Sequence, residues 1–345
     1  MTPIRKKDRG LFEYQDRMQR LKMSKTPLDK LNSFIPWEMF RATLTDALEI
    51  KEQKAPGGSS HYDYVFMFKV LVYQRYYNLS DEKTEFQIND SLSTQRFLGI
   101  TLSDQVPDQK QIWAFREKLK RLKLLEKLFL QFDAFLEKKG VVGKVGSIVD
   151  ASFVEVPRQR NSREENEKIK AGEIPADWTE NPDKLAQKDT DARWTKKNDE
   201  KHYGYKNHVK MDSHSKIVRT FEVTSANVHD SQALDKLLNE KDEGRSLHAD
   251  SAYSGKPIAE MLEKRGIKNR IHEKGTRGKP LTKEQKRENK KKSRVRVRVE
   301  HRFGFQQNSM GGSFIRTIGM ERAKTLIGFN NLVYNMARFA QIKGR

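Results

Sequence analysis

The chain has 345 residues, of which 35% are hydrophobic and 33% charged, which is enough for about two domains with a sizeable core. Lys and Arg number 68 against 47 Asp and Glu, and the net charge of +21 favours a polyanionic partner, most often nucleic acid. The chain has no cysteine, which excludes disulfides, zinc–thiolate sites and thiol nucleophiles. It also has no apolar run long enough to cross a bilayer, so we expect a cytoplasmic protein with no membrane partner.

Residues 1–60 are predicted to form a basic N-terminal arm, as far as about residue 35, and then a helix. The spacing of Phe40, Leu44 and Leu48 is typical of one helix face. The stretch "KAPGGSS" at 54–60 reads as a linker because it is rich in Gly, Pro and Ser.

Residues 61–143 are predicted to form a helical DNA-binding domain. The apolar stretch 62–79 indicates a buried helix, Ser80 can cap the next one, and Gly99 can end a third. A fourth helix is expected to begin after Pro107 and to continue to Gly140. It carries Lys110 and Arg116, which we interpret as candidate DNA contacts, the alternative being a solvated charged face.

The pattern changes to alternating strands and helices in residues 144–345. Strands are expected at 145–157, 203–212, 216–226, 246–253 and 267–274, and helices at 230–240, 256–266 and 320–342. This order predicts an α/β (α+β) fold, in which a mixed sheet is flanked by helices. The polar segment 158–201 has equal numbers of acidic and basic residues and no sustained period, so we interpret it as an insertion.

Two aspartates are expected at neighbouring strand ends. Asp150 follows "GSIV" and Asp250 follows "LHA". Ligands of open sheets bind at the carboxyl ends of strands, and two close carboxylates repel each other unless a divalent cation lies between them. The alternative is that each aspartate only starts a turn.

A third acid, Glu300, lies at the end of the most basic part of the chain. Residues 263–302 hold 17 basic and 5 acidic side chains. The run "RVRVRV" alternates like a strand, whereas Val295, Val299 and Phe303 have the spacing of a helix face. The pattern alone leaves both possibilities open.

Six ordered blocks of the sequence resemble the DDE transposases of bacterial insertion sequences, specifically the IS-five type. The blocks are "IVDASFVEVPRQR", "WTKKNDEKHYGYKNHVKMD", "TSANVHDSQAL", "HADSAYSG", "RVRVEHRFG" and "IGMERAKTLIGFNNLVYNMARF". The resemblance covers roughly residues 40–342. It implies a ribonuclease-H-like catalytic domain in 144–345, with Asp150, Asp250 and Glu300 as the catalytic and metal-binding acids and Glu300 on a helix.

Related transposases carry a signature of Tyr, Arg, Glu and Lys at fixed gaps. Arg296 and Glu300 fit this signature, whereas Ser293 stands in the place of the Tyr and Gln307 in that of the Lys. The departure puts phosphate contacts at those two positions in doubt.

The resemblance implies metal-dependent cleavage at the ends of an insertion sequence and transfer of the freed 3′-hydroxyl into target DNA. Two Mg²⁺ ions, for which Mn²⁺ can substitute, are expected to serve both in-line displacements. The expected partners are double-stranded DNA, namely terminal inverted repeats and target, and a second copy of the chain in a synaptic homodimer at the bacterial nucleoid.

Several basic residues are candidate DNA contacts, and a solvated Arg is the alternative for Arg296: Lys206, Arg296, Arg298, Arg302, Lys110 and Arg116. Two other functions stay open at this point. One is a catalytically inactive, transposase-derived DNA-binding regulator, and the other is a ribonuclease-H-like nuclease without strand transfer.

Overall fold

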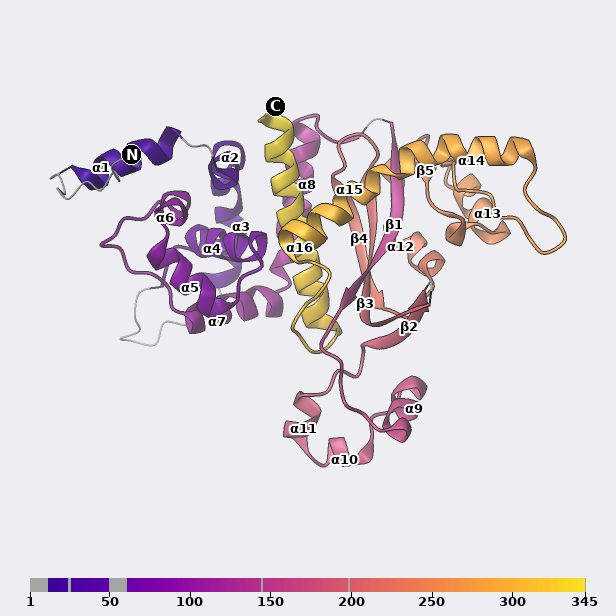
Figure 1. The fold of residues 1–345 in the computed structure, drawn as a ribbon, viewed down its shortest axis with the longest axis horizontal. Coiled ribbons are helices and arrows are strands. Elements are labelled where there is room, and N and C mark those ends of the chain that lie inside the picture. The colour runs from indigo at the N-terminus through magenta and orange to yellow at the C-terminus, as the bar shows by residue number, and fades with distance from the viewer. Residues whose placement is uncertain (1–11, 24–25, 50–60, 144, 198, 345) are drawn as a thin grey trace, which may run out of the picture. The chain divides into compact units, whose positions relative to one another are not determined.

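The computed structural model describes residues 12–23, 26–49, 61–143, 145–197 and 199–344 (Figure 1). The chain divides into a helical unit, Met1–Gln74 with Leu79–Glu117 and Phe339–Arg345, and a unit built on a sheet, Arg75–Asn78 with Lys118–Arg338. The predicted boundary at 143/144 stays a prediction, although residues 118–143 group with the sheet. Among the described residues, no helix has an apolar stretch that could cross a bilayer.

Short helices make up most of the helical unit: α1 (Glu13–Met23), α2 (Pro27–Phe34), η1 (Trp37–Phe40), α3 (Arg41–Glu49), α4 (Tyr64–Tyr76), α5 (Asp81–Asp90), α6 (Leu92–Leu98) and α7 (Gln109–Arg121). Phe40, Phe68 and Phe97 are completely buried at its centre. The predicted caps are confirmed, since the Ser80 side chain accepts the N–H of Lys83 and Gly99 ends α6 in the left-handed conformation.

Two expectations for this part of the chain are corrected. Residues 13–23 and 27–34, predicted as part of an arm, form α1 and α2, and a capping box of Thr26 and Asp29 fixes the start of α2. Residues 1–11 and the predicted linker 54–60 lie outside the described residues. The long helix expected as far as Gly140 is interrupted at Lys123, whose φ of 51° ends α7, and α8 (Leu124–Lys138) follows.

The sheet has six strands: β1 (Gly146–Glu155), β2 (Arg193–Lys197), β3 (Glu200–Asp212), β4 (Val218–Ser225), β5 (Ser246–His248) and β6 (Lys268–Asn269). Their order is β2-β3-β1-β5-β6, and β4 also pairs with β3. β1 is antiparallel to β3 and parallel to β5, so the predicted mixed sheet is confirmed.

Helices cover both faces of the sheet. Successive side chains of β1 point to opposite faces, so neighbouring residues of β1 pack against different helices. Val149 packs with Leu234 of α12 (Leu234–Leu237) and Leu262 of α13 (Lys256–Lys264). Ile148 instead packs with Val299 of α15 (Arg298–Gly304). Asp150 is two residues after Ile148 and therefore lies on the α15 face.

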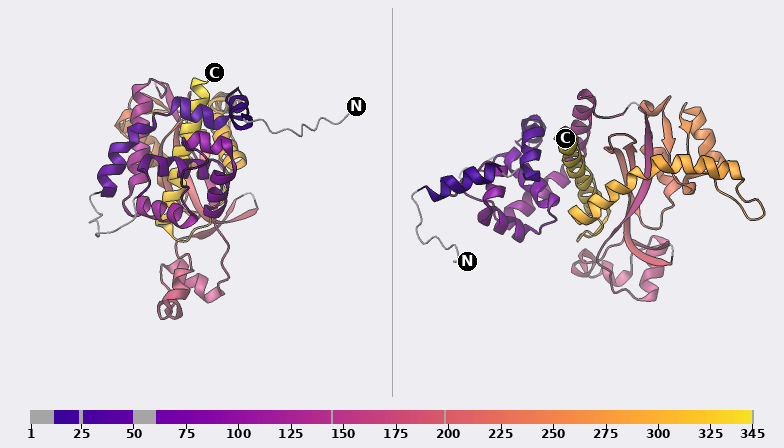
Figure 2. Two further views of the ribbon diagram at one scale, coloured as in Figure 1. Left: turned by 90° about the vertical axis from the view of Figure 1, so that its left-hand side faces the viewer. Right: turned by 45° about the horizontal axis from the view of Figure 1, so that its top comes forward.

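The "RVRVRV" run is helical. α14 (Lys283–Arg296) and α15 are separated by Val297, and both run across the strands in Figure 2. The C-terminal α16 (Met320–Lys343) is confirmed as one helix, but the expected apolar stripe is corrected, because residues 327–337 are all buried and the helix is therefore enclosed on every side there. The helix predicted over 230–240 is broken into short turns, of which α12 has four residues.

The polar insertion is partly ordered by its own helices. α9 (Arg163–Ala171), α10 (Ala176–Thr179) and α11 (Pro182–Ala186) precede β2, so the predicted segment 158–201 ends inside the sheet. Trp178 is completely buried and its Nε1 donates to Glu165 at 2.8 Å, which supports packing within the insertion.

Gly146 allows β5 to approach β1 closely, and this pairing sets the position of both aspartates. A Cβ on Gly146 would lie 2.6 Å from the backbone oxygen of Ser246. We predict that Gly146→Ala lowers the free energy of unfolding by about 1–3 kcal/mol, because backbone atoms must shift. Urea unfolding at pH 7 measures this change.

Gly304→Ala is the matched control. Gly304 has helical dihedrals and no atom within 4 Å of an added Cβ, so alanine should leave stability unchanged or raise it by up to about 1 kcal/mol. Equal unfolding curves for the Gly146→Ala protein and the wild type would contradict this prediction. They would show that the close approach of β5 to β1 leaves room for a larger side chain at this position.

Candidate active site

Asp150 and Asp250 lie beyond the paired part of two neighbouring parallel strands. β1 and β5 pair only as far as Ile148 and His248, and each aspartate comes two residues later. The expectation that Asp150 ends its strand is wrong, because β3 continues to pair with β1 as far as Glu155. Asp250 starts the turn η4 (Ser251–Tyr253), and its Oδ1 accepts the N–H of Ala252 at 2.8 Å.

The Asp150 carboxylate is largely buried, with 13% of its side chain exposed. Its Oδ1 accepts the N–H of Ala151 at 2.8 Å, and its Oδ2 accepts Arg296 Nη1 at 3.0 Å. Burial raises the pKa of Asp150 to about 6; the negative charge of Asp250 adds to this rise, and the Ala151 N–H and Arg296 oppose it. The two aspartates are thus close enough to repel each other.

Arg296 connects the first and third predicted acids. It is the last residue of α14, and its Nη2 lies 3.8 Å from Glu300 Oε1, one helical turn further on. The Glu300 side chain is 59% exposed, in contrast to that of Asp150. The guanidinium therefore sits between a buried and an exposed carboxylate and partly neutralises both.

The donor chemistry of these acids suits a hard divalent cation, because carboxylate oxygens are the ligands that Mg²⁺ prefers. The buried Asp150 also gains from added positive charge, as its raised pKa shows. Among the described residues, however, no three His, Asp or Glu side chains are grouped closely enough to hold an ion. Next to Asp150 the structure places Arg296 in addition to Asp250.

Two further residues near the acids are not predicted from the sequence. Tyr253 is completely buried, and its hydroxyl has no hydrogen-bond partner among the described residues. Burial raises its pKa well above the usual value, and Asp230, Asp150 and Asp250 add to the rise. Its place three residues after Asp250, in "DSAY", is the one signal that the sequence offers.

His272 is the second of these residues. Burial and the charges of Arg296 and Lys292 lower its pKa, which the nearby Asp250 opposes. Its Nε2 lies 3.4 Å from the hydroxyl of Ser293, the residue that stands in the place of the signature tyrosine. Nothing in the sequence around His272 indicates this neighbourhood.

The basic candidates differ in how accessible their side chains are. Arg298 is exposed and donates to the Ser213 carbonyl at 2.8 Å, and Lys110 is also exposed. Lys206 is nearly buried and donates to Asp230 at 2.8 Å. Arg302 is completely buried and donates to Asn331 Oδ1 at 2.6 Å.

Two of the expected DNA contacts are corrected, because the Lys206 and Arg302 side chains are enclosed by protein. Arg116 forms a two-pronged ion pair with Asp81 at 2.7 Å, and part of its side chain stays exposed. A DNA contact at Arg116 therefore stays a prediction.

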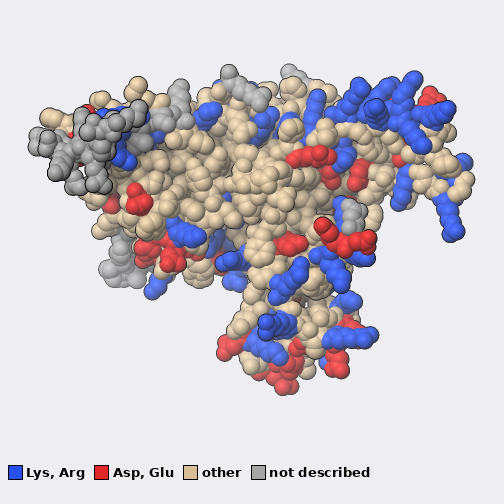
Figure 3. Space-filling view, in the orientation of Figure 1, with Lys and Arg blue, Asp and Glu red and all other residues tan. Residues whose placement is uncertain are grey.

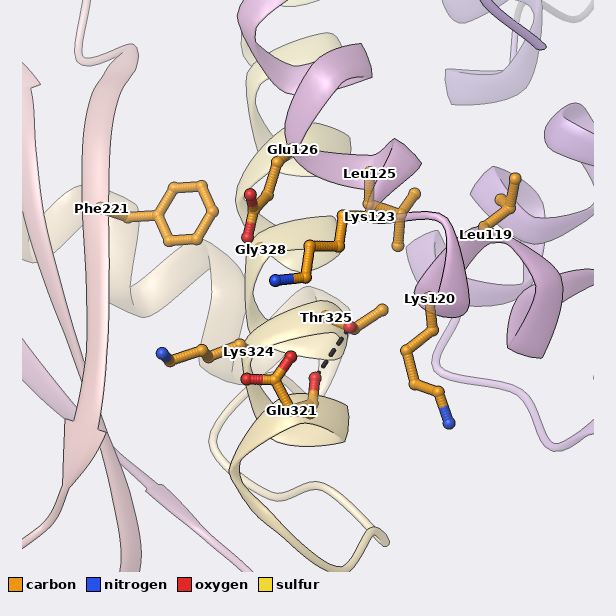
Figure 4. A pocket seen from close by; sticks show the side chains of 10 residues that line it. All are labelled: Leu119, Lys120, Lys123, Leu125, Glu126, Phe221, Glu321, Lys324, Thr325 and Gly328. Carbon is orange, nitrogen blue, oxygen red and sulfur yellow. Dashed lines mark hydrogen bonds between the residues drawn. The ribbon is translucent and has the colours of Figure 1, made fainter. Parts of the chain in front are cut away.

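A cleft elsewhere in the sheet unit mixes both charges (Figure 4). It lies between the turn after α7, strand β4 and helix α16, and none of the three predicted acids lines it. Its lining residues are Leu119, Lys120, Lys123, Leu125, Glu126, Phe221, Glu321, Lys324, Thr325 and Gly328. The acids are thus not part of this cleft.

Replacing the buried Asp150 with Asn should stabilise the protein at neutral pH. The folded state holds a proton on Asp150 up to about pH 6, against about 4 when unfolded, so stability falls as pH rises through this range. We predict that Asp150→Asn raises the free energy of unfolding at pH 7 by about 1–3 kcal/mol and flattens its dependence between pH 4 and 6. Urea unfolding in EDTA measures both effects.

An exposed acid of the same unit, Asp183 of α11, provides the control. Asp183→Asn should change stability by less than about 0.5 kcal/mol. A lower stability of the Asp150→Asn protein at pH 7 would mean that the pair with Arg296 outweighs the cost of burial.

Comparison with known proteins identifies the family. Residues 142–336, more than half of the chain, match the family model described as Transposase DDE domain. Residues 15–118 match a second model, Transposase domain (DUF772). Among solved structures, the cryo-EM structure of the piggyBac transposase synaptic complex with hairpin DNA is similar, at 11% identity and a TM-score of 0.43. That match covers 95% of this chain and 78% of the other, but its score is too low to carry an argument.

The family matches confirm the predicted resemblance to DDE transposases, a family that uses divalent metal ions. They cover both the helical region and the domain that carries the acids. The chain belongs to the DDE transposase family and is a DNA-cutting and strand-transfer enzyme.

Proposed function

We propose that this transposase is of the IS-five type and that Asp150, Asp250 and Glu300 are its catalytic acids. It cleaves DNA at the ends of its insertion sequence and joins the freed 3′-hydroxyl to target DNA. One observation carries the proposal: the buried Asp150 and Asp250 each lie two residues beyond the parallel β1–β5 pairing, and Asp150 is linked to Glu300 through Arg296. The matching order of the six sequence blocks supports the subgroup.

The residues Asp150, Asp250 and Glu300 would hold two Mg²⁺ ions, for which Mn²⁺ can substitute. When bound, such ions lower the pKa of an attacking water or hydroxyl and stabilise the leaving oxygen. The large burial of Asp150 supports this role, since a buried carboxylate gains most from a nearby cation.

The protein itself fixes the acids to different degrees. Asp150 lies on the central strand β1, where it pairs with Val209 of β3, and Asp250 is held by its bond to Ala252. Glu300 follows the interruption at Val297 and is mostly exposed. We infer that Glu300 moves towards the two aspartates when the site is assembled, while the aspartates stay in place.

Arg296 has a second task in this proposal. Its guanidinium is planar and can bind a carboxylate or a phosphate in the same two-pronged way. Once the acids are neutralised by cations, Arg296 is available for the phosphate next to the scissile bond. Arg298, exposed two residues later, is the second candidate phosphate contact.

The partners and location follow from the chemistry. We propose that the enzyme binds its terminal inverted repeats and target DNA as a homodimer in a synaptic complex. A DNA substrate in a bacterium also implies that it works in the cytoplasm, at the nucleoid.

The test uses labelled element-end DNA and a target duplex with Mg²⁺ or Mn²⁺. The wild type should cleave the end and join its 3′-hydroxyl to the target. Asp250→Asn and Glu300→Gln should each lower cleavage by about 10³-fold or more, as expected when a catalytic group is removed. Binding of the same DNA in EDTA should be unchanged.

Glu284→Gln, which removes an exposed acid of α14, is the control and should cleave normally. Wild-type cleavage by the Glu300→Gln protein would disprove the assignment of this residue. Cleavage without joining would favour the nuclease, and binding without cleavage would favour the regulator.

A further inference from the structure

The helix that leads to Glu300 is the most basic element of the sheet unit. α14 contains eight basic and two acidic residues among fourteen. Lys and Arg gather over this helix in the space-filling view (Figure 3), more densely than elsewhere on that face. No hydrophobic side chain of α14 is buried, so its composition is not explained by a core role.

Four of these cations line one face of the helix. Lys283, Arg287, Lys290 and Arg294 are spaced by four, three and four residues, which places them in one row along α14. All four are exposed, and none forms an ion pair with a carboxylate in the part of the chain that the structure describes. We call these four residues the α14 row.

The opposite face of α14 holds the helix in place. Lys292 donates to the Ile271 carbonyl at 2.9 Å, and Arg296 contacts Asp150. Asn289 donates to the Glu273 carbonyl at 3.0 Å. The α14 row is thus not needed for anchoring. Its like charges at four-residue spacing also repel one another, which disfavours the helix unless an anion neutralises them.

We propose that the α14 row binds the phosphates of a DNA duplex whose sequence is not fixed. The row spans twelve residues, from Lys283 to Arg294, or about 16 Å, along which one DNA strand presents about five phosphates. Contacts from Lys and Arg to phosphates position a duplex but read no sequence. This chemistry fits the flanking DNA beside the element or the target DNA, rather than the inverted repeat.

The inference rests on the proposed function in one respect, namely that the duplex is a substrate of the transposase. It does not depend on the assignment of the three acids. Binding measured in EDTA therefore tests the α14 row even if the catalytic proposal fails, and the cleavage assay tests the acids separately.

The experiment replaces all four residues of the α14 row with Gln. Binding of a random duplex is measured in EDTA over a range of salt concentrations. Each phosphate contact contributes about −0.9 to the slope of log affinity against log salt. The slope of the variant should therefore be less steep than that of the wild type by about 3 to 4. Unfolding curves confirm that the variant is folded.

A control variant carries the same change in net charge at four exposed lysines that do not form a row: Lys168, Lys170, Lys256 and Lys264, each changed to Gln. The slope of the control variant should become less steep by less than about 1. An equal loss in both variants would overturn the proposal, because the effect would then reflect net charge alone. So would an unchanged slope for the α14-row variant on every duplex tested.

Two further duplexes identify the source of the DNA: an element end with its flank, and the same end cut to remove the flank. A loss of similar size on all three duplexes supports target DNA, and a larger loss on the flanked end than on the cut end supports flanking DNA. A larger loss on the cut end than on the random duplex would overturn the proposal, since the row would then favour the sequence of the element itself.

Discussion

The burial of one carboxylate, that of Asp150, is the constraint around which the sheet unit is arranged. A buried carboxylate close to a second one is costly, and the structure meets this cost with Arg296 and with the N–H of Ala151. The raised pKa of Asp150 shows that these contacts do not fully compensate. Such an unbalanced charge favours binding of a cation, which is the property a metal-dependent enzyme requires.

The topology explains why Asp150, Asp250 and Glu300 lie in one region of the sheet unit although the last two are 100 and 150 positions after the first. The parallel β1–β5 pair brings Asp150 and Asp250 to the same level of the sheet, and the alternation of β1 turns Asp150 towards α15. The interruption at Val297 then lets α14 reach outward with its row of cations while Glu300 stays near the sheet. The row of exposed cations and the acid Glu300 thus lie on separate parts of one helical segment.

Much of this arrangement can be predicted from the sequence, because β-branched alternation, caps and apolar spacing are local signals. These local signals predict β1, β3, α6 and α16, and the six ordered sequence blocks indicate the family. The bounds of β1 follow from its own residues, since the strand expected at 145–157 is found at Gly146–Glu155, but the point at which β5 stops pairing with it, Ile148, depends on distant residues. The burial of Arg302 and the positions of Tyr253 and His272 likewise depend on distant contacts, such as that of Arg302 with Asn331. The "RVRVRV" run shows the same limit, because its alternation fits a strand while its packing against Ile148 and Met211 makes it a helix.

The most direct test of the central claim is anomalous diffraction from crystals of the protein grown with element-end DNA and Mn²⁺. If the acids act together, manganese should be found within bonding distance of the carboxylates at positions 150, 250 and 300, with the guanidinium of residue 296 turned to a phosphate. Manganese bound elsewhere, with the 150–296 ion pair intact and the three carboxylates still apart, would contradict the account.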